Sequence, residues 1–82
     1  MLKILEDLIL LARDRRQNPV GDSYTNQLLE NKTLIKDKIL EEINELIEAV
    51  ETDTNKVHEA ADVFYHLLIY LESNNIKIED IM

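Results

Sequence analysis

The chain has 82 residues, a formal net charge of −8 at pH 7 and no cysteine. Without cysteine, neither a disulfide framework nor a zinc–thiolate site is available. The acidic balance argues against general affinity for nucleic acid or anionic membranes, because phosphate contacts need Lys and Arg. One Gly, one Pro and 45% hydrophobic residues indicate a compact all-α chain that forms a single domain over residues 1–82.

The opening run MLKILEDLILLA predicts an amphipathic helix from about Leu2 to Arg16. Lys3, Glu6 and Asp7 interrupt the run, which is too short to span a membrane and lacks a small-residue cleavage site. The inner face of this helix is apolar and consists of Leu5, Leu8, Ile9 and Ala12. We therefore expect a soluble cytoplasmic protein with neither membrane nor nucleic-acid partners.

The segment QNPVGDS, residues 17–23, contains the only Pro and the only Gly and is predicted to be a loop. Asp22 or Ser23 is a suitable N-cap for a short second helix that runs through Glu30.

A third helix is predicted from about Thr33 to Glu51. The segment TDTN, residues 52–55, ends it and offers Asp53 or Thr54 as the next N-cap. The apolar stripe of the third helix consists of Ile35, Ile39, Ile43, Leu46 and Val50.

A fourth helix is predicted to run to about Glu72, and the chain then turns into a short final helix that ends at Met82. The fourth helix is the most apolar segment. Its wide apolar face consists of Val57, Ala60, Ala61, Phe64, Leu67, Leu68 and Leu71. Further apolar residues flank the polar row on the other side, namely Val63, Tyr65, Ile69 and Tyr70. We expect the wide face to fill the core of a small bundle of four to five helices with short connections.

Two pairs of carboxylates have i, i+3 spacing on the third and fourth helices. Glu42 and Glu45 border the apolar stripe of the third helix, while Glu59 and Asp62 lie with His66 opposite the wide apolar face of the fourth. The short link between these helices requires antiparallel packing, so the two pairs can face each other.

Four facing carboxylates would repel one another at neutral pH unless cations lie between them. A site made only of carboxylate oxygens suits Mg²⁺, with Mn²⁺ as a substitute, and substrate phosphates complete the coordination. The alternative is an ordinary solvated face, like that of Glu41 and Glu48. An acidic pair on an otherwise apolar helix favours the metal site.

Several other polar side chains have both a structural and a functional interpretation. His66 can simply hydrogen-bond a neighbour, and Tyr65 and Tyr70 are more typical of packing than of catalysis. A basic cluster just before the loop either complements the helix dipole or reaches a substrate phosphate. This cluster consists of Arg13, Arg15 and Arg16.

Three sequence motifs carry a resemblance to a known family. The run EEINE at 41–45, followed after 13 residues by EAAD at 59–62, resembles the EExxE…ExxD signature of the MazG-like all-α nucleotide pyrophosphohydrolases. More narrowly, SYT at 23–25, KILEE at 38–42 and EAADVFYHLL at 59–68 resemble phosphoribosyl-ATP pyrophosphohydrolases. The similarity extends from about Arg13 to Ile81.

The sequence departs from the family pattern at two places. Leu40 stands where the family usually has Gly before the Glu pair, which is expected to change how closely substrate approaches the third helix. The sequence ends at Met82, whereas family members tend to continue into a tail that contains Leu and Arg. This departure leaves open any substrate contact made from the C-terminus.

The resemblance implies a homodimer that hydrolyses the α–β phosphoanhydride bond of phosphoribosyl-ATP with Mg²⁺, the second step of histidine biosynthesis. The implied metal ligands are Glu42, Glu45, Glu59 and Asp62. Either Glu41 or Glu45 would act as the general base toward water. The candidates for substrate contacts are Arg13, Arg16, Ser23, Tyr24, Thr25, Lys38 and His66.

Two other functions remain as alternatives. A house-cleaning pyrophosphatase for non-standard or deoxynucleoside triphosphates would share both carboxylate pairs, but has no reason to keep the SYT and Tyr-His motifs. A non-catalytic helical dimer would leave the acidic residues of the fourth helix unexplained.

Overall fold

The computed structural model describes residues 3–81, apart from the side chains of Ile4 and Leu5. The described residues form five helices and no strand, so the all-α prediction is confirmed. These helices are α1 (Lys3–Gln17), α2 (Tyr24–Glu30), α3 (Lys32–Thr52), α4 (Lys56–Ser73) and α5 (Ile78–Ile81). The expected helix ends at Leu2 and Met82, and the inward side chain of Leu5, lie outside the described part.

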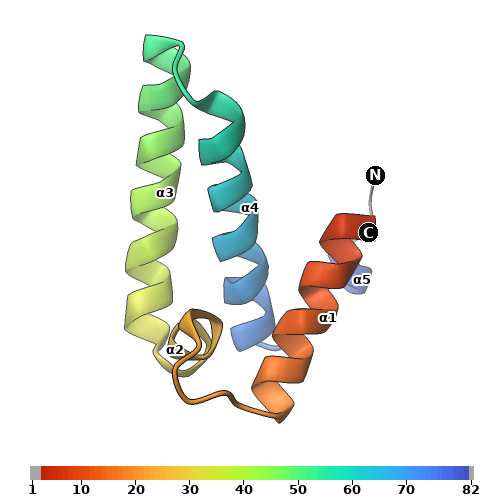
Figure 1. Ribbon diagram of the computed structural model, residues 1–82. Coiled ribbons are helices and arrows are strands. Elements are labelled where there is room, and N and C mark those ends of the chain that lie inside the picture. The colour runs from red at the N-terminus through yellow and green to blue at the C-terminus, as the bar shows by residue number, and fades with distance from the viewer. Residues whose placement is uncertain (1–2, 82) are drawn as a thin grey trace.

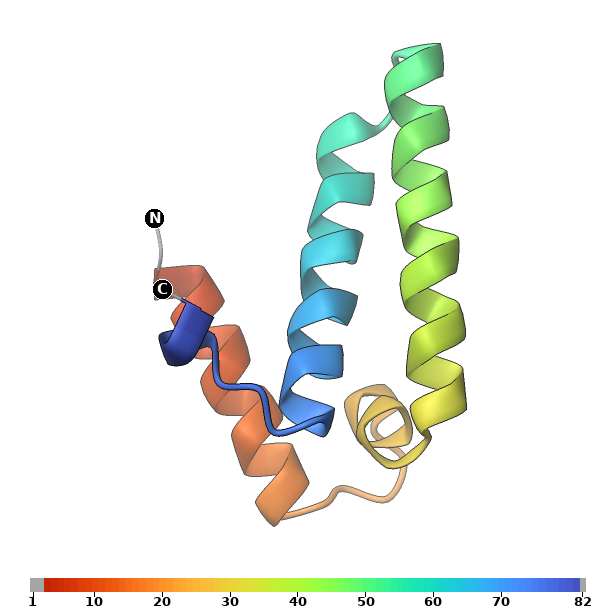
Figure 2. The ribbon, with the colours of Figure 1, turned by 180° about the vertical axis from the view of Figure 1, so that it is seen from behind.

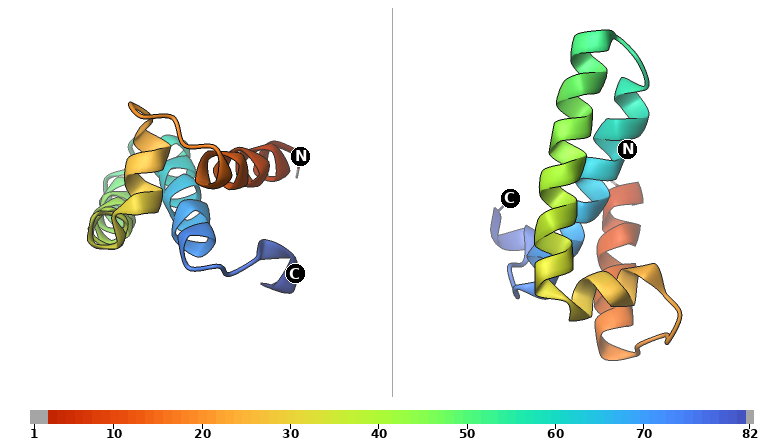
Figure 3. Two further views of the ribbon diagram at one scale, coloured as in Figure 1. Left: turned by 90° about the horizontal axis from the view of Figure 1, so that it is seen from below. Right: turned by 90° about the vertical axis from the view of Figure 1, so that its left-hand side faces the viewer.

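An antiparallel hairpin of α3 and α4 is the longest feature of the fold (Figure 1). The helix α1 packs on the other side of α4, as the view from behind also shows (Figure 2). The short α5 follows the end of α4 and is linked to α1 by an ion pair between Arg13 and Glu79. The short α2 crosses the open end of the hairpin and contacts α1, α3 and α4 (Figure 3). Within residues 3–81, one long face of the hairpin therefore has no covering helix.

Side-chain caps explain where α2 and α3 begin. The Ser23 hydroxyl accepts a hydrogen bond from the Asn26 backbone N–H at 3.3 Å, so the predicted N-cap of α2 is confirmed. Asn31 caps both neighbouring helices. Its backbone N–H closes α2 on the Gln27 carbonyl, and its side chain accepts from the Leu34 N–H at 3.0 Å.

The predicted N-cap of α4 is wrong. Asp53 has a left-handed backbone with φ of 56°, and its N–H bonds to the carbonyls of Ala49 and Val50, so it ends α3 instead. Asn55, with φ of 50°, occupies the N-cap position of α4 but makes no side-chain cap hydrogen bond. Asp53 therefore satisfies carbonyl groups at the C-terminus of α3, and α4 begins only at Lys56.

The core is small and draws one residue from each of the four longer helices. Its fully buried members are Ala12, Leu28, Ile35 and Ile69. On α1, the expected inner residues Leu8 and Ile9 are half-buried beside buried Ala12. Asn26 fastens the loop to α1 from a buried position. Its side-chain amide donates to the Arg15 carbonyl at 2.6 Å, and its side-chain oxygen accepts from the Val20 N–H at 2.9 Å.

The expectation that the wide apolar face of α4 fills the core is wrong in part, and the apolar stripe of α3 is likewise only partly buried. On α3 the buried line runs through Ile35, Glu42 and Ala49, while Ile43 and Val50 of the predicted stripe are exposed. On α4, Phe64 is 55% exposed. None of the five described helices covers this side of the hairpin in the single chain, and the acidic side of α4 faces inward instead. No described helix is long and apolar enough to cross a membrane.

Candidate metal centre and substrate site

The carboxylates of α3 gather in one helical turn on the side that faces α4. Oxygen atoms of Glu41, Glu42 and Glu45 lie within 4.8 Å of one another. Glu42 is buried, while the other two carboxylates are exposed. The spacing i, i+3 places Glu42 and Glu45 one above the other on the helix surface. This turn therefore offers one buried carboxylate and two accessible ones.

A second acidic group lies on the first turns of α4. Ligand atoms of His58, Glu59 and Asp62 are also within 4.8 Å of one another. The His58 Nε2 atom is 3.5 Å from an Asp62 carboxylate oxygen, and both Glu59 and Asp62 are half-buried. His58 was missed in the sequence analysis, although its i, i+4 spacing from Asp62 signals a neighbour on the same helix face.

The charges of the two pairs act on each other across the hairpin. Burial, followed by repulsion from Glu45 and Asp62, raises the pKa of Glu42, although His66 opposes the shift. Burial and repulsion from Glu45 and Asp62 likewise raise the pKa of Glu59. The structure therefore brings together the four carboxylates that the sequence pattern paired, with Glu45 next to both raised groups.

This arrangement has the donor set that a hard divalent cation requires. One oxygen of Glu42 and one of Glu59 are buried without any hydrogen-bond partner in the described structure. Buried carboxylate oxygens normally have a partner, so these two need an explanation. A hard divalent cation such as Mg²⁺ binds carboxylate oxygens, so a cation held at each acidic group would give its orphan oxygen a partner. Beside Glu59, but not lined by Glu42, lies an open polar cavity of about 160 Å³ whose other lining residues include Glu45, Thr54 and Asn55.

Several of the predicted substrate contacts lie next to Glu42. Lys38 forms an ion pair with Glu41 at 3.2 Å. The Tyr24 hydroxyl is 2.9 Å from His66 Nε2, and the Thr25 hydroxyl is 2.6 Å from that of Tyr65. The motif at 23–25 thus docks α2 on α4 beside the acidic turn of α3. Tyr65 was expected only to pack, and this hydrogen bond is an additional role.

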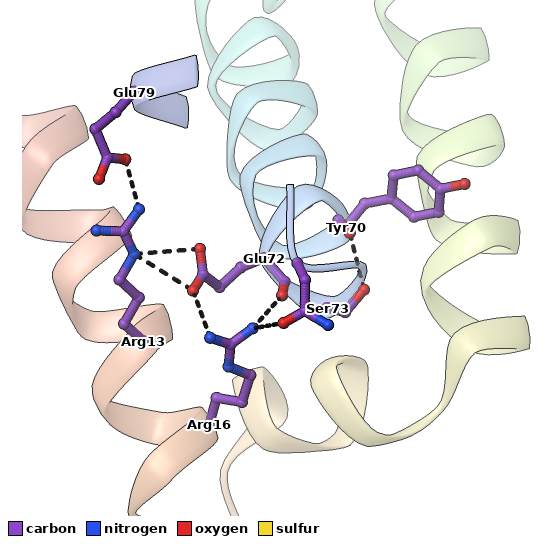
Figure 4. Close-up of polar contacts among 7 residues, drawn as sticks. Arg13, Arg16, Tyr70, Glu72, Ser73 and Glu79 are labelled. Carbon is purple, nitrogen blue, oxygen red and sulfur yellow. Dashed lines mark hydrogen bonds and ion pairs between the residues drawn. The ribbon is translucent and has the colours of Figure 1, made fainter. Parts of the chain in front are cut away.

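The predicted basic contacts lie elsewhere. Arg13 and Arg16 both pair with Glu72 on the α1 side of α4, at 3.3 Å each, and Arg13 also bonds Glu79 of α5 (Figure 4). Arg16 further donates to the Glu72 carbonyl and to the Asn75 side chain. The structure therefore gives both guanidinium groups structural partners and does not bring them to the acidic cluster.

Ser23 also has a structural partner, because its hydroxyl accepts from the Arg15 guanidinium at 2.7 Å while it caps α2. Glu72, which was not predicted to have any role beyond the helix end, is buried between two arginines. Its signal in the sequence is its i+3 position after the core residue Ile69, which places a carboxylate on the inward face.

Leu40, which replaces the usual Gly, is 54% exposed and lines an apolar groove with Ile39, Leu67 and Tyr70. The groove joins the uncovered faces of α3 and α4, and Leu40 is roughly opposite Glu42 on the helix. The structure therefore places Leu40 away from the carboxylates, and the expected change in how closely substrate approaches α3 stays a prediction. Leu40 enlarges the uncovered apolar face.

The fold and the site together define an all-α protein in which a helical hairpin holds two facing carboxylate pairs, the architecture of a candidate metal-dependent phosphohydrolase. The family model for phosphoribosyl-ATP pyrophosphohydrolase matches residues 5–82. The chain belongs to this family.

Relatives with curated names agree with this assignment. The chain is 42% identical over 82 residues to a phosphoribosyl-ATP pyrophosphatase of Clostridium acetobutylicum, covering 96% of this chain and 74% of the relative. It is 39% identical over 85 residues to the protein of the same name from Bacillus mycoides, covering 100% of this chain and 79% of the relative. A histidine biosynthesis bifunctional protein of Caldanaerobacter subterraneus is 37% identical over 83 residues, covering 98% of this chain and 40% of the relative. No solved structure matches the chain significantly.

Proposed function

We propose that this chain hydrolyses phosphoribosyl-ATP to phosphoribosyl-AMP and pyrophosphate, as a Mg²⁺-dependent enzyme of histidine biosynthesis in the cytoplasm. The observation that carries the proposal is the pair of unpartnered, buried oxygens of Glu42 and Glu59 inside a four-carboxylate cluster. Family membership and the names of the relatives support the choice of substrate.

Glu42, Glu45, Glu59 and Asp62 are the residues that would hold the metal ion. When bound, Mg²⁺ neutralises the triphosphate, orients it and lowers the pKa of a coordinated water. Mn²⁺ has similar ligand preferences and is expected to substitute. The acidic cluster can then hold a polyphosphate that it would otherwise repel.

The remaining chemistry belongs to side chains at the rim. Glu41 and Glu45 are exposed, so either of them can accept a proton from the attacking water. Attack of that water on the α-phosphorus breaks the α–β anhydride bond and releases pyrophosphate. Lys38, one turn before Glu42 and already paired with Glu41, supplies positive charge for a substrate phosphate. No covalent enzyme intermediate is required.

The test is pyrophosphate release from phosphoribosyl-ATP, ATP and the four deoxynucleoside triphosphates, each with Mg²⁺ and with a chelator. We expect much higher kcat/KM for phosphoribosyl-ATP and no release in the chelator. The variant Glu45→Gln should lose activity by orders of magnitude, while Asp37→Asn, at an exposed position of the same helix, should not. Preference for a deoxynucleotide would refute the substrate assignment and favour a house-cleaning pyrophosphatase.

The second part of the proposal is that the enzyme works as a homodimer through the uncovered apolar face of the hairpin. This face comprises Leu40, Ile43, Ile47 and Val50 of α3 with Val57, Phe64 and Leu67 of α4, all of them exposed in the single chain. A contiguous apolar surface of this kind is typical of a protein interface. A chain of 82 residues also buries too little core to be very stable alone.

Light scattering measures the association directly. At micromolar concentration we expect about twice the chain mass of 9.6 kDa. A particle of the single-chain mass would contradict the dimer but would leave the hydrolysis assay unaffected.

A further inference from the structure

Three aromatic rings form a cluster beside the buried carboxylate Glu42. Tyr24 of α2 lies nearly parallel to Tyr65 of α4, with ring centroids 6.4 Å apart and planes 14° apart. His66 meets both rings edge-on, at 5.9 Å from Tyr24 and 5.0 Å from Tyr65. The imidazole is only 6% exposed, so its orientation is fixed by its neighbours.

Hydrogen bonds at both ring nitrogens determine what His66 does. Its Nδ1 atom is 2.7 Å from the Asp62 carbonyl oxygen. A carbonyl oxygen can only accept, so Nδ1 carries the proton. In the neutral ring Nε2 is then an acceptor, and the Tyr24 hydroxyl donates to it at 2.9 Å. The backbone of α4 thus fixes His66, and His66 fixes the phenol of Tyr24.

Tyr24 is anchored at its hydroxyl but presents much of its ring to solvent. The residue is 44% exposed. Burial of the phenol raises the pKa of Tyr24, and the charges of Lys38, Glu42 and Glu41 also act on it. Through its hydrogen bond to His66, Tyr24 lies one helical turn of α4 from Asp62 of the acidic site. The other strongly exposed aromatic residue, Phe64, lies on the uncovered apolar face and not beside the carboxylates.

We propose that the exposed ring of Tyr24 receives the aromatic base of the nucleotide, and that His66 is a positioning residue that acts through Tyr24 without touching the substrate. The inference rests on the proposed function, which places the phosphates on the carboxylates by way of a divalent cation. An aromatic face next to a polyphosphate site is where a base can stack, and one such stack changes affinity about 5- to 150-fold. Fixing the ring in advance reduces the ordering that binding would otherwise require.

The ring itself is tested by the binding of ATP with Mg²⁺, with inorganic triphosphate as a ligand that lacks a base. Calorimetry should show that Tyr24→Leu weakens ATP binding about 5- to 150-fold and leaves the Kd of triphosphate within twofold. Equal weakening of both ligands, or of neither, would overturn the inference. This readout does not depend on hydrolysis. A parent protein that binds ATP but releases no pyrophosphate from phosphoribosyl-ATP would refute the proposed function alone.

The role of His66 is tested by a double-mutant cycle on the same Kd. Tyr24→Phe removes the donor and keeps the ring, whereas His66→Asn keeps a donor for the Asp62 carbonyl and removes the acceptor at Nε2. Each should weaken ATP binding about 2- to 12-fold, the range for one hydrogen bond. The double variant should be no weaker than the weaker single one, because both changes remove the same bond.

Two further variants separate positioning from a structural role. His66→Gln places an amide oxygen near the position of Nε2 and should restore most of the affinity that His66→Asn loses. Tyr65→Phe removes the hydrogen bond to Thr25, which joins α2 to α4 as the bond between Tyr24 and His66 does. It should lower the melting temperature without changing how much Tyr24→Phe weakens ATP binding. If the fold-increase in Kd of the double variant equals the product of the two single fold-increases, His66 acts independently of Tyr24. That outcome would overturn the assignment of His66 as a positioning residue.

Discussion

Replacing Glu42 with Gln should make the metal-free protein more stable while removing its activity. Glu42 is buried, one of its oxygens has no hydrogen-bond partner, and its carboxylate faces Glu45 and Asp62. The amide keeps the shape of the side chain and removes one negative charge. The NH₂ group of the Gln side chain can also donate to the carboxylate of Glu45, whereas in the parent protein the carboxylates of residues 42 and 45 repel each other.

The size of the effect follows from the separation of the charges. Two like charges 4.8 Å apart, the outer limit for this cluster, repel by about 3.5 kcal/mol at an effective dielectric constant of 20 and by about 0.9 kcal/mol in bulk water. Glu45 is exposed, so solvent screens the pair and the lower part of this range applies. We therefore expect the free energy of unfolding to rise by about 1–2 kcal/mol, which raises the melting temperature by at least about 4 °C.

The assay is thermal unfolding at fixed protein concentration in a chelator and again in Mg²⁺, together with pyrophosphate release. By binding linkage, Mg²⁺ at a hundred times its Kd should raise the free energy of unfolding of the parent by about 2.7 kcal/mol, and its melting temperature with it. The same Mg²⁺ should stabilise Glu42→Gln much less. Activity should fall about 100-fold or more. The control Asp37→Asn should change the free energy of unfolding by less than about 0.5 kcal/mol.

A lower melting temperature for Glu42→Gln in the chelator would refute the reasoning, because the charge would then stabilise the fold. If Mg²⁺ raises the melting temperatures of parent and variant equally, Glu42 is not a ligand of the metal ion.

Four other outcomes follow from the structure. The raised pKa values of Glu42 and Glu59 mean that these carboxyl groups hold their protons more tightly in the folded state than in the unfolded chain. The stability that protonation contributes is therefore present at acid pH and is lost as the pH rises through the raised pKa values. In a chelator, the melting temperature of the parent relative to a double Gln variant at both positions should therefore rise as the pH falls toward the ordinary glutamate value of 4.5. A constant difference would contradict this. Glu72→Gln leaves two guanidinium groups without their shared anion and should cost about 2 kcal/mol by urea unfolding, and no loss would mean that the ion pairs are fully screened. Asn26→Ala removes the two side-chain hydrogen bonds that Asn26 makes to Val20 and Arg15 and should cost about 2 kcal/mol by the same measurement. Phe64→Ser should shift the mass in light scattering toward that of one chain without unfolding the helices by circular dichroism, whereas an unchanged mass would exclude this face as the interface.

The sequence by itself determined the helices and the composition of the acidic site. Helix starts and ends depend on nearby residues, so the cap at Ser23 could be read from its place before a periodic segment. The spacing i, i+3 places Glu42 with Glu45, and Glu59 with Asp62, on shared helix faces whatever the rest of the fold does. The short link then made the two pairs face each other. Local geometry was sufficient for all of these predictions.

Only the tertiary structure decided which side of each long helix is inward. An apolar helix surface does not reveal its covering partner, so Phe64 was expected in the core and is exposed in the single chain. The packing of α1 on α4 decided that Arg13 and Arg16 bind Glu72, more than 50 residues away along the sequence. In the same way, the crossing of α2 brought Tyr24 to His66, although 42 positions separate them. Contacts of this range depend on the angles at which helices pack, and these angles come from the summed contacts of the whole core and not from any local pattern.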